Sequence, residues 1–187
     1  MELEKIKEQV KNVLSEKRFY HSVCTMKQCE LLAKHYGIDL EKARKVGIAH
    51  DIAKEMPTDE KLEYAKSHNL SVNDVEKSSP TLLHAKIGAD ICKEKFNFSQ
   101  EMVQAVYQHT TGGLNMSLLA KILFVADGTG DDRNWEDLEY VRNLAIEDID
   151  KAILYMLDFT IKECLSKNSL IHLDTIICRN ELMKNNI

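Results

Sequence analysis

A chain of 187 residues is long enough to form one domain with a sizeable core. Its hydrophobic fraction of 44% and charged fraction of 29% are ordinary for a globular protein, and they argue against disorder and against membrane insertion. The formal net charge of −5 argues against a binder of long nucleic acids, because such a protein needs a basic surface to displace counterions from phosphates. A small phosphorylated ligand is not excluded, since the charge of the whole chain does not describe a pocket.

The cysteines and the apolar segments indicate the compartment. The five cysteines are an odd set without a Cys-x-x-Cys pair, so the sequence predicts neither a zinc knuckle nor a disulfide framework. The first 14 residues are charged and amphipathic, and they lack the apolar core of a signal peptide. The most hydrophobic stretch, residues 117–127, is interrupted by Lys121 and is shorter than the ~20 residues of a membrane span. We therefore expect a cytoplasmic protein that does not cross or bind a membrane.

Apolar residues recur at helical spacing almost throughout the chain, and alternating runs of β-branched residues are missing. The sequence therefore predicts an all-α fold, a compact single-domain helical bundle. The expected helices cover residues 3–14, 21–36, 40–50, 58–69, 84–96, 100–109, 117–127, 135–144 and 149–165, each within a few positions. The polar stretch 71–80 is expected to be a surface loop, and the segment beyond residue 170 receives no assignment.

Turn and cap residues mark several of these boundaries. Gly37 is expected to end the second helix in a left-handed conformation. The side chains of Asp39, Thr58, Ser99 and Asp148 are candidate caps at the starts of later helices.

Six imidazole and carboxylate side chains stand near the edges of the expected helices. They are His21, His50, Asp51, His84, His109 and Asp127. A lone histidine near a helix end is more often a capping residue than a ligand, but the set offers the mixed, cysteine-free ligands that hard-to-borderline metals prefer. Small or apolar residues flank the His-Asp dipeptide, and burying that pair without a cation would be costly. We therefore predict a metal centre. The remaining helical histidines, His35 and His68, are expected to be solvated.

Four of these residues fit the pattern of the HD-domain superfamily of metal-dependent phosphohydrolases, in which a histidine, a His-Asp dipeptide and a distant aspartate lie on separate helices. The places are taken by His21, His50-Asp51 and Asp127. The chain more closely resembles the YqeK-type subfamily in further segments, namely Arg18–His21, Leu83–Ala85, His109–Gly112 and Met116–Ile122. This resemblance implies a single HD domain over residues 1–187, with a core at about 18–130 and C-terminal helices at about 135–187 that complete it.

The resemblance also implies an activity and a ligand set. Members of the subfamily are symmetrical bis(5′-nucleosyl)-tetraphosphatases that hydrolyse diadenosine tetraphosphate to two ADP with a two-metal centre, usually of iron. The same ligands would accept manganese, cobalt or zinc. By resemblance, one metal is held by His21, His50, Asp51 and Asp127, and the second by His84, His109 and a bridging Asp51. Two ions ~3.5–4 Å apart can share a hydroxide and lower its pKa, so we expect a metal-bridging hydroxide to attack an inner phosphorus atom.

Two cations are candidates to assist this reaction. Arg18 precedes the first candidate ligand by three residues, and its guanidinium can grip two phosphate oxygens at once. Lys54 lies about one helical turn beyond the first residue of the dipeptide. It is either a catalytic residue that reaches the phosphate or a solvated surface lysine.

Two further segments are candidates for substrate binding. Thr110 and Thr111 can bind phosphate or can form an ordinary turn at a helix end. Arg133 resembles a family arginine in the loop after the last ligand. That loop departs from the Asp-Tyr-Ile-Glu-Pro sequence of many relatives, because flexible and acidic residues occupy positions 128–132, which puts the fit of the substrate in question. Residues 170–175 resemble a family Pro-x-x-Pro-Asp-Thr segment, and they either approach the nucleoside or form a plain terminal segment.

Other functions are open on the same scaffold. One is hydrolysis of another nucleotide, such as a deoxynucleotide or a guanosine alarmone, and another is a non-catalytic nucleotide-binding module. In each case the expected partner is a small nucleotide, with a dinucleoside polyphosphate as substrate and ADP as product in the leading reading. A homodimer is an open alternative to a monomer.

Overall fold

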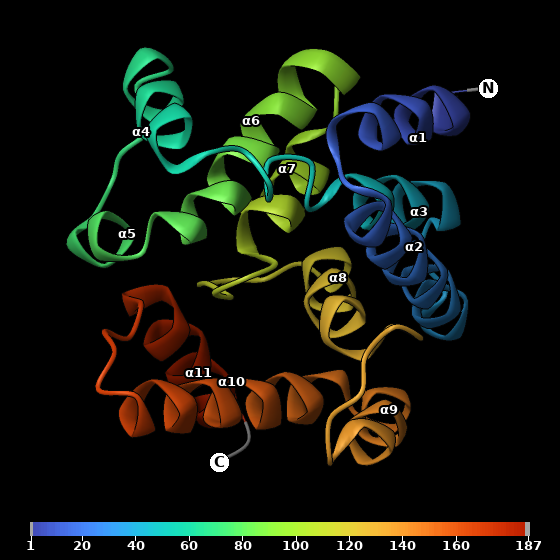
Figure 1. Ribbon diagram of the computed structural model, residues 1–187. Helices are drawn as coiled ribbons and strands as arrows, with labels where there is room; N and C mark the ends of the chain where they lie inside the picture. Colours follow the sequence, from blue (N-terminus) through green and yellow to red (C-terminus); the bar gives the residue numbers. More distant parts are fainter. Residues whose placement is uncertain (1, 186–187) are drawn as a thin grey trace.

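The computed structural model describes residues 2–185, and within that range the chain is helical without a β-strand (Figure 1). The helices are α1 (Glu2–Val13), α2 (Glu16–Tyr36), α3 (Leu40–Ala49), α4 (Thr58–Ser67), α5 (Asp74–Ser78), η1 (Pro80–Leu82), α6 (Leu83–Phe96), α7 (Gln100–Gln108), α8 (Leu118–Thr129), α9 (Leu138–Glu147), α10 (Ile149–Ser166) and α11 (Leu173–Asn185). The all-α prediction is confirmed. Among the described residues, no helix combines the length and the apolar character that a membrane crossing requires.

Local capping fixes several helix ends where the sequence predicts them. Gly37 has a φ of 69° after α2, and its backbone N–H donates to a carbonyl of the preceding turn. The side chains of Asp39 and Asp148 each accept two backbone N–H groups at the starts of α3 and α10. Ser117 caps α8 in the same way through one N–H group.

Some predicted boundaries are wrong. Residues 71–80 are not a plain loop, because Asn73 and Glu76 form a capping box that starts the short helix α5, and the 3-10 helix η1 follows. A helix of five residues is too short to show a hydrophobic repeat, so periodicity misses it. Thr58 is the first residue of α4 and does not cap it, since Pro57 occupies the N-cap position. Helix α9 begins three residues later than expected, at Leu138.

The most apolar helix, α8, lies in the middle of the molecule (Figure 1). It contacts α2, α3, α7, α9 and α10. One hydrophobic cluster extends from Ile6 in α1 to Leu182 in α11, so the C-terminal helices share a core with the N-terminal ones. The elements that carry the candidate ligands are therefore held by one continuous packing arrangement.

Helices α2 and α3 cross closely, and Gly47 makes the crossing possible. A Cβ atom at this position would lie 2.7 Å from Cα of Met26 and 3.1 Å from Sγ of Cys29. The first of these neighbours is backbone, which cannot move without shifting α2. Because His21 lies on α2 and His50 follows α3, this glycine sets the distance between two candidate ligands.

We predict that Gly47→Ala destabilises the protein. Helix propensity alone would favour alanine by about 1 kcal/mol, but the clash with the backbone of α2 should outweigh it and lower the free energy of unfolding by about 1–3 kcal/mol. Urea unfolding measures the difference. Gly128→Ala is the matched control, because its Cβ would meet the end of the flexible Met156 side chain, which can move away. A Gly47→Ala protein as stable as the parent would contradict the prediction.

Candidate metal centre

The structure brings all six predicted ligands to one place between the helices. His21 lies in the second turn of α2, His50 and Asp51 follow α3, His84 is the second residue of α6, His109 follows α7, and Asp127 lies in the last turn of α8. The expectation that each ligand stands at a helix edge is wrong for His21, because α2 begins at Glu16 and extends past it. The four histidines and Asp51 are each at most 4% exposed.

The carboxylate of Asp51 lies between two pairs of histidines. Its Oδ2 atom is 3.8 Å from Nε2 of His21 and 3.6 Å from Nε2 of His50. Its Oδ1 atom is 3.2 Å from Nε2 of His84 and 3.6 Å from Nε2 of His109. Each oxygen therefore faces a different pair of imidazole nitrogens.

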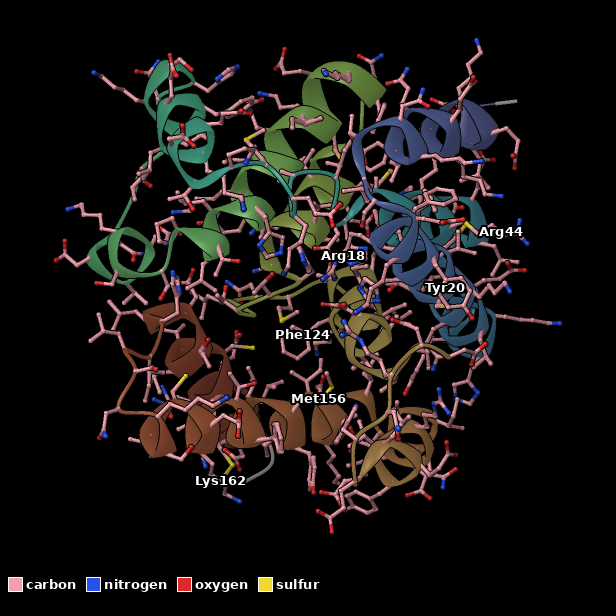
Figure 2. The ribbon with its side chains drawn as sticks, in the orientation of Figure 1. Arg18, Tyr20, Arg44, Phe124, Met156 and Lys162 are labelled. Carbon is pink, nitrogen blue, oxygen red and sulfur yellow. The ribbon has the colours of Figure 1, made fainter. Side chains whose placement is uncertain are left out.

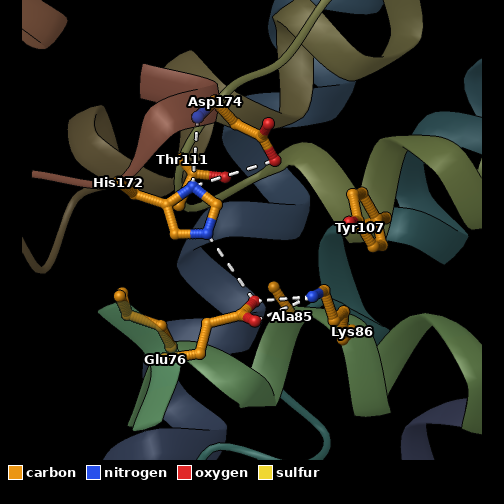
Figure 3. Close-up of a pocket in the computed structure, with 8 residues that line it drawn as sticks. Glu76, Ala85, Lys86, Tyr107, Thr111, His172 and Asp174 are labelled. Carbon is orange, nitrogen blue, oxygen red and sulfur yellow. Dashed lines mark hydrogen bonds and ion pairs between the residues drawn. The ribbon is translucent and has the colours of Figure 1, made fainter. Parts of the chain in front are cut away.

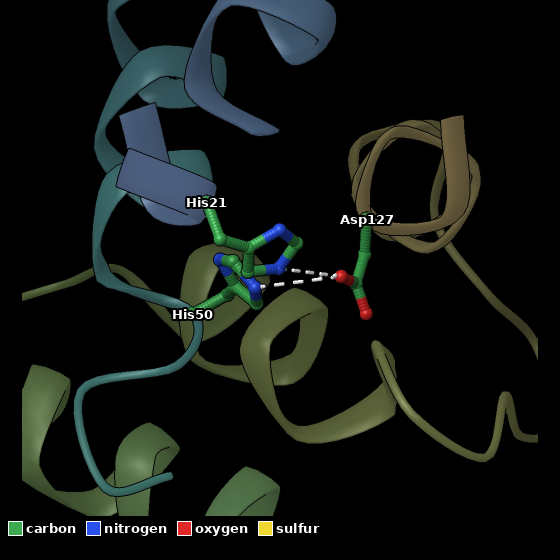
Figure 4. Close-up of side chains that lie close together, drawn as sticks. All are labelled: His21, His50 and Asp127. Atoms are coloured by element: carbon green, nitrogen blue, oxygen red, sulfur yellow. Dashed lines mark ion pairs between the residues drawn. The ribbon is translucent and has the colours of Figure 1, made fainter. Parts of the chain in front are cut away.

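Asp127 supplies a second carboxylate on one side of the cluster. Its Oδ1 atom is 3.0 Å from Nε2 of His21 and 3.7 Å from Nε2 of His50. The dashed lines in Figure 4 mark these two pairs. There are two groups of three residues within which the ligand atoms all lie within 4.8 Å of one another. The first group is His21, His50 and Asp127, and the second is His50, Asp51 and His109.

Backbone carbonyls orient three of the histidines. A carbonyl oxygen only accepts hydrogen bonds, so the Nδ1 atom that contacts it carries the proton and leaves a lone pair on Nε2. The pairs are His50 with Gly47 O at 2.8 Å, His84 with Thr81 O at 2.6 Å, and His109 with Val106 O at 2.6 Å. All three Nε2 lone pairs are thereby directed to the centre of the cluster.

The donor set fits metal ions. The Nε2 atoms of His84 and His109 lie 3.1 Å apart, and two unprotonated nitrogens at that distance repel each other unless a positive group, such as the Lys54 ammonium or a bound cation, lies near them. Among the described residues, His50 Nε2 and Asp51 Oδ1 are buried atoms without a hydrogen-bond partner. Buried polar atoms normally have partners, and imidazole and carboxylate are ligands that metals such as iron, manganese and zinc accept.

The ionisation states also suit metal binding. Burial opposes ionisation of Asp51, but the neighbouring His50, His109 and His84 and the Lys54 ammonium outweigh it and hold the pKa of the carboxyl well below its usual range. Burial lowers the pKa of His84 to about 4, with help from the nearby His109 and Lys54. At neutral pH the carboxylate is therefore charged and this imidazole is neutral, which are the forms that coordinate metals.

Four of the five predicted substrate-binding residues contact the ligands. Arg18 donates from Nη1 to Asp51 Oδ2 at 3.0 Å, and Lys54 Nζ lies 3.1 Å from Nε2 of His84. The Thr110 hydroxyl lies 3.0 to 3.1 Å from two of the imidazole Nε2 atoms. Arg133 donates from Nη2 to Asp127 Oδ1 at 2.6 Å. Lys54 is therefore not a freely solvated lysine.

Thr111 faces another cluster. Its hydroxyl donates to the carbonyl of Gly112, and its own carbonyl accepts from the Thr175 hydroxyl. Beside it, His172 lies 3.6 Å from the buried carboxylate of Glu76, which also pairs with Lys86 (Figure 3). The cavity here measures about 10 Å³, which is room for about one water molecule. The segment 170–175 thus packs on the turn after α7 and does not line a nucleoside-sized pocket at this place.

A larger cavity of about 660 Å³ opens on the His21 side of the cluster. Its lining includes Lys17, Arg18, Tyr20, His21, Asp132 and Arg133. The volume is within the range of small-molecule sites, and three cations, two carboxylates (Glu55 and Asp132) and one exposed aromatic ring line it. The cavity therefore suits an anionic ligand with an aromatic part.

Sequence reasoning missed Asp132. Its Oδ2 atom lies 2.8 Å from Nδ1 of His21, so it does for this histidine what a backbone carbonyl does for the other three. The signal available in the sequence was an acidic residue in the loop after the last ligand. Spacing does not distinguish such a residue from a solvated one.

The comparisons with known proteins agree with this site. The HD domain family model matches residues 18–129. The chain is 38% identical over 93% of its length to the symmetrical bis(5′-nucleosyl)-tetraphosphatase of Halalkalibacterium halodurans, and 30% identical over 93% to that of Bacillus subtilis, covering 93% and 94% of those proteins. A predicted HD superfamily hydrolase involved in NAD metabolism from Clostridium acetobutylicum has a crystal structure with a TM-score of 0.94, 35% identity and 97% coverage of both chains.

We predict that Asp51→Ala removes bound metal. Both groups of histidines lose the carboxylate that lies between them, so the affinity should fall by at least about 100-fold, the upper end of what loss of an outer-shell contact costs. Metal analysis of freshly purified protein measures the loss. His35→Ala is the control, because His35 is exposed on α2 away from the cluster, and its metal content should equal that of the parent. An Asp51→Ala protein with undiminished metal would refute the assignment.

Proposed function

Because the chain belongs to the HD domain family, we propose that it is a metal-dependent phosphohydrolase that cleaves diadenosine tetraphosphate symmetrically into two ADP. Relatives named for this activity cover nearly the whole chain, and the crystal structure with a TM-score of 0.94 has the same fold. The six residues that we propose as ligands lie together in one cluster.

One observation carries the proposal, namely the position of the Asp51 carboxylate. Each of its oxygens faces a separate pair of imidazoles, and a carboxylate can bridge two ions in a way that an imidazole cannot. In our proposal His21, His50, Asp51 and Asp127 hold one metal, and His84, His109 and Asp51 hold the other. When bound, such a pair of ions supplies an activated water molecule and neutralises phosphate charge.

The protein's own cations would act on the phosphate chain. Arg18 spends one donor on Asp51, and its side chain is 31% exposed at the edge of the large cavity, so its remaining N–H groups are available to phosphate oxygens. Lys54 lies against His84 on the opposite side, where we place it near the leaving phosphate. Thr110 lies beside Lys54, since both contact His84 Nε2, and it has a hydroxyl that can donate to the same phosphate.

The cavity lined by Arg18 and Arg133 is our proposed site for one nucleotide half. Attack at an inner phosphorus atom places the scissile bond at the ligand cluster and a nucleoside diphosphate on each side of it. Tyr20 is 58% exposed on the cavity wall, and an aromatic ring there can stack on a base. We keep Thr111 as a proposed phosphate contact through its backbone, since its hydroxyl bonds locally.

Further assignments belong to the same proposal. We propose iron as the metal, because the subfamily that the chain resembles uses it. We propose the cytoplasm as the compartment, which five free cysteines suit. We also propose that residues 1–187 act as one domain and that a homodimer is the oligomer to test first.

The product pattern tests the activity. Incubation of the metal-loaded protein with diadenosine tetraphosphate should give ADP as the only nucleotide product, because the proposed attack is at an inner phosphorus atom. Chromatography of the products measures this. AMP together with ATP would rule out the symmetrical cut, and turnover of a deoxynucleotide or guanosine alarmone in preference to the tetraphosphate would favour the alternative hydrolase. Tight ADP binding without turnover would favour the non-catalytic module.

We predict that Arg18→Ala lowers kcat/KM for the tetraphosphate by about 10- to 100-fold, because a hydrogen bond to a charged group contributes about 1.5–3 kcal/mol. Arg18→Lys should recover only part of the loss, since an ammonium cannot bind two oxygens in a fork. Arg44→Ala is the matched control, because Arg44 lies at the outer edge of the same helix pair, far from Arg18, and bonds to Glu30 (Figure 2). Steady-state kinetics decide, and equal losses in the variants of Arg18 and Arg44 would contradict the assignment.

A further inference from the structure

The loop between α8 and α9 contains a carboxylate that neither the sequence pattern nor the proposed ligand set uses. Asp132 lies in this loop, and its Oδ2 atom is 2.8 Å from Nδ1 of His21. The Asp132 side chain is 17% exposed, and the His21 side chain is 5% exposed. Because an ionised carboxylate only accepts hydrogen bonds, this contact keeps the proton on Nδ1 and the lone pair on Nε2, which faces Asp127.

His21 depends on such a partner because of its position inside α2. The other three histidines lie at helix ends, where a carbonyl of the preceding turn accepts from Nδ1. Inside a helix the neighbouring carbonyls are already bonded to backbone N–H groups. A partner for His21 Nδ1 must therefore come from another part of the chain, and the loop after α8 supplies it.

The loop is shaped to bring Asp132 to this position. A Cβ atom on Gly130 would lie 3.0 Å from Asp132 Oδ1, which is tighter than most real contacts, and 3.4 Å from the backbone of Cys24. Gly130 has a φ of −58°, so another residue could adopt its backbone conformation, and it is the space that favours glycine. Arg142 of α9 donates to the carbonyls of Thr129 and Gly130 and holds this part of the loop in place.

We propose that Asp132 is a positioning residue of the metal centre, which fixes the tautomer and the ring orientation of His21 and thereby sets the affinity of the ion that His21 and Asp127 hold. This inference rests on the proposed metal centre. It gives a function to the stretch of chain that departs most from the family pattern. Outer contacts of this kind, from carboxylate to histidine to metal, typically change affinity by about 10- to 100-fold.

Metal titration tests the inference without nucleotide. Mn²⁺ is titrated calorimetrically into chelator-treated protein, and the dissociation constant is compared among the parent, Asp132→Ala, Asp132→Asn and Asp131→Asn. We expect Asp132→Ala to bind about 10- to 100-fold more weakly, and Asp132→Asn to lie between it and the parent, because it retains an acceptor but loses the charge. Asp131→Asn is the matched control, since Asp131 is exposed and faces Arg142, and its affinity should not change.

A second variant perturbs the contact between Asp132 and His21 without changing either residue. Gly130→Ala should weaken Mn²⁺ binding by pushing Asp132 away from His21, and it should have no further effect in an Asp132→Ala background, because the contact is already lost. An additive effect of the two substitutions would mean that Gly130 acts on the metal by another route and would contradict this part of the inference.

The outcomes separate this inference from the metal centre itself. A parent protein that binds no Mn²⁺ defeats the proposed centre, whereas a parent that binds and Asp132 variants within twofold of it defeat only the role of Asp132. Urea unfolding of the metal-free proteins excludes a merely structural effect, which would lower stability and leave the affinity unchanged. If Asp132→Ala does not fold, the nearly isosteric Asp132→Asn decides by its affinity alone.

Discussion

The structure depends on the burial of one carboxylate. Asp51 is 2% exposed, and an isolated buried charge costs several kcal/mol unless opposite charge or strong donors surround it. Arg18 contributes one hydrogen bond and Lys54 a more distant charge, while the four imidazole Nε2 atoms that face the two oxygens carry lone pairs and would offset the charge only through a cation. These groups come from different helices, so compensation of this charge requires α2, α3, α6 and α7 to meet at one point. In the proposed metal centre, bound cations would complete the compensation.

The packing of apolar residues around the cluster holds these helices in position. Helix α8 is buried on most sides and carries Asp127 to the cluster, while α10 packs against α8 and α11 packs against α10. The close crossing of α2 and α3 at Gly47 brings together the helix that holds His21 and the turn that holds His50. The same helix contacts thus build the core and position the candidate ligands. A shift of one helix would therefore move the ligand that it carries.

Much of the fold and the membership of the candidate ligand cluster could be predicted from the sequence, because their signals are local. Helical periodicity and caps such as Asp39 and Asp148 act over a few residues, and the six candidate ligand residues can be identified from their order in the chain. The short helix α5 was missed because its capping box is its only signal. Asp132 was missed because its role exists only through a contact with a residue 111 positions away. Residues 128–132 differ from those of many relatives. The structure gives two of these residues a packing role, since Gly128 and Gly130 leave space for the side chains of Met156 and Asp132.

The way the histidines are oriented has a consequence for assembly. His50, His84 and His109 are each aligned by a carbonyl only three residues earlier, so each can adopt its orientation as soon as its own turn forms. His21 is aligned only after a chain segment of more than a hundred residues has closed, and closing a longer loop costs more entropy. The orientations of His84 and His109 therefore depend on local contacts alone, whereas the orientation of His21 depends on the closure of most of the chain. In the proposed metal centre, the site of His21 and Asp127 is thus the one most directly coupled to completion of the fold.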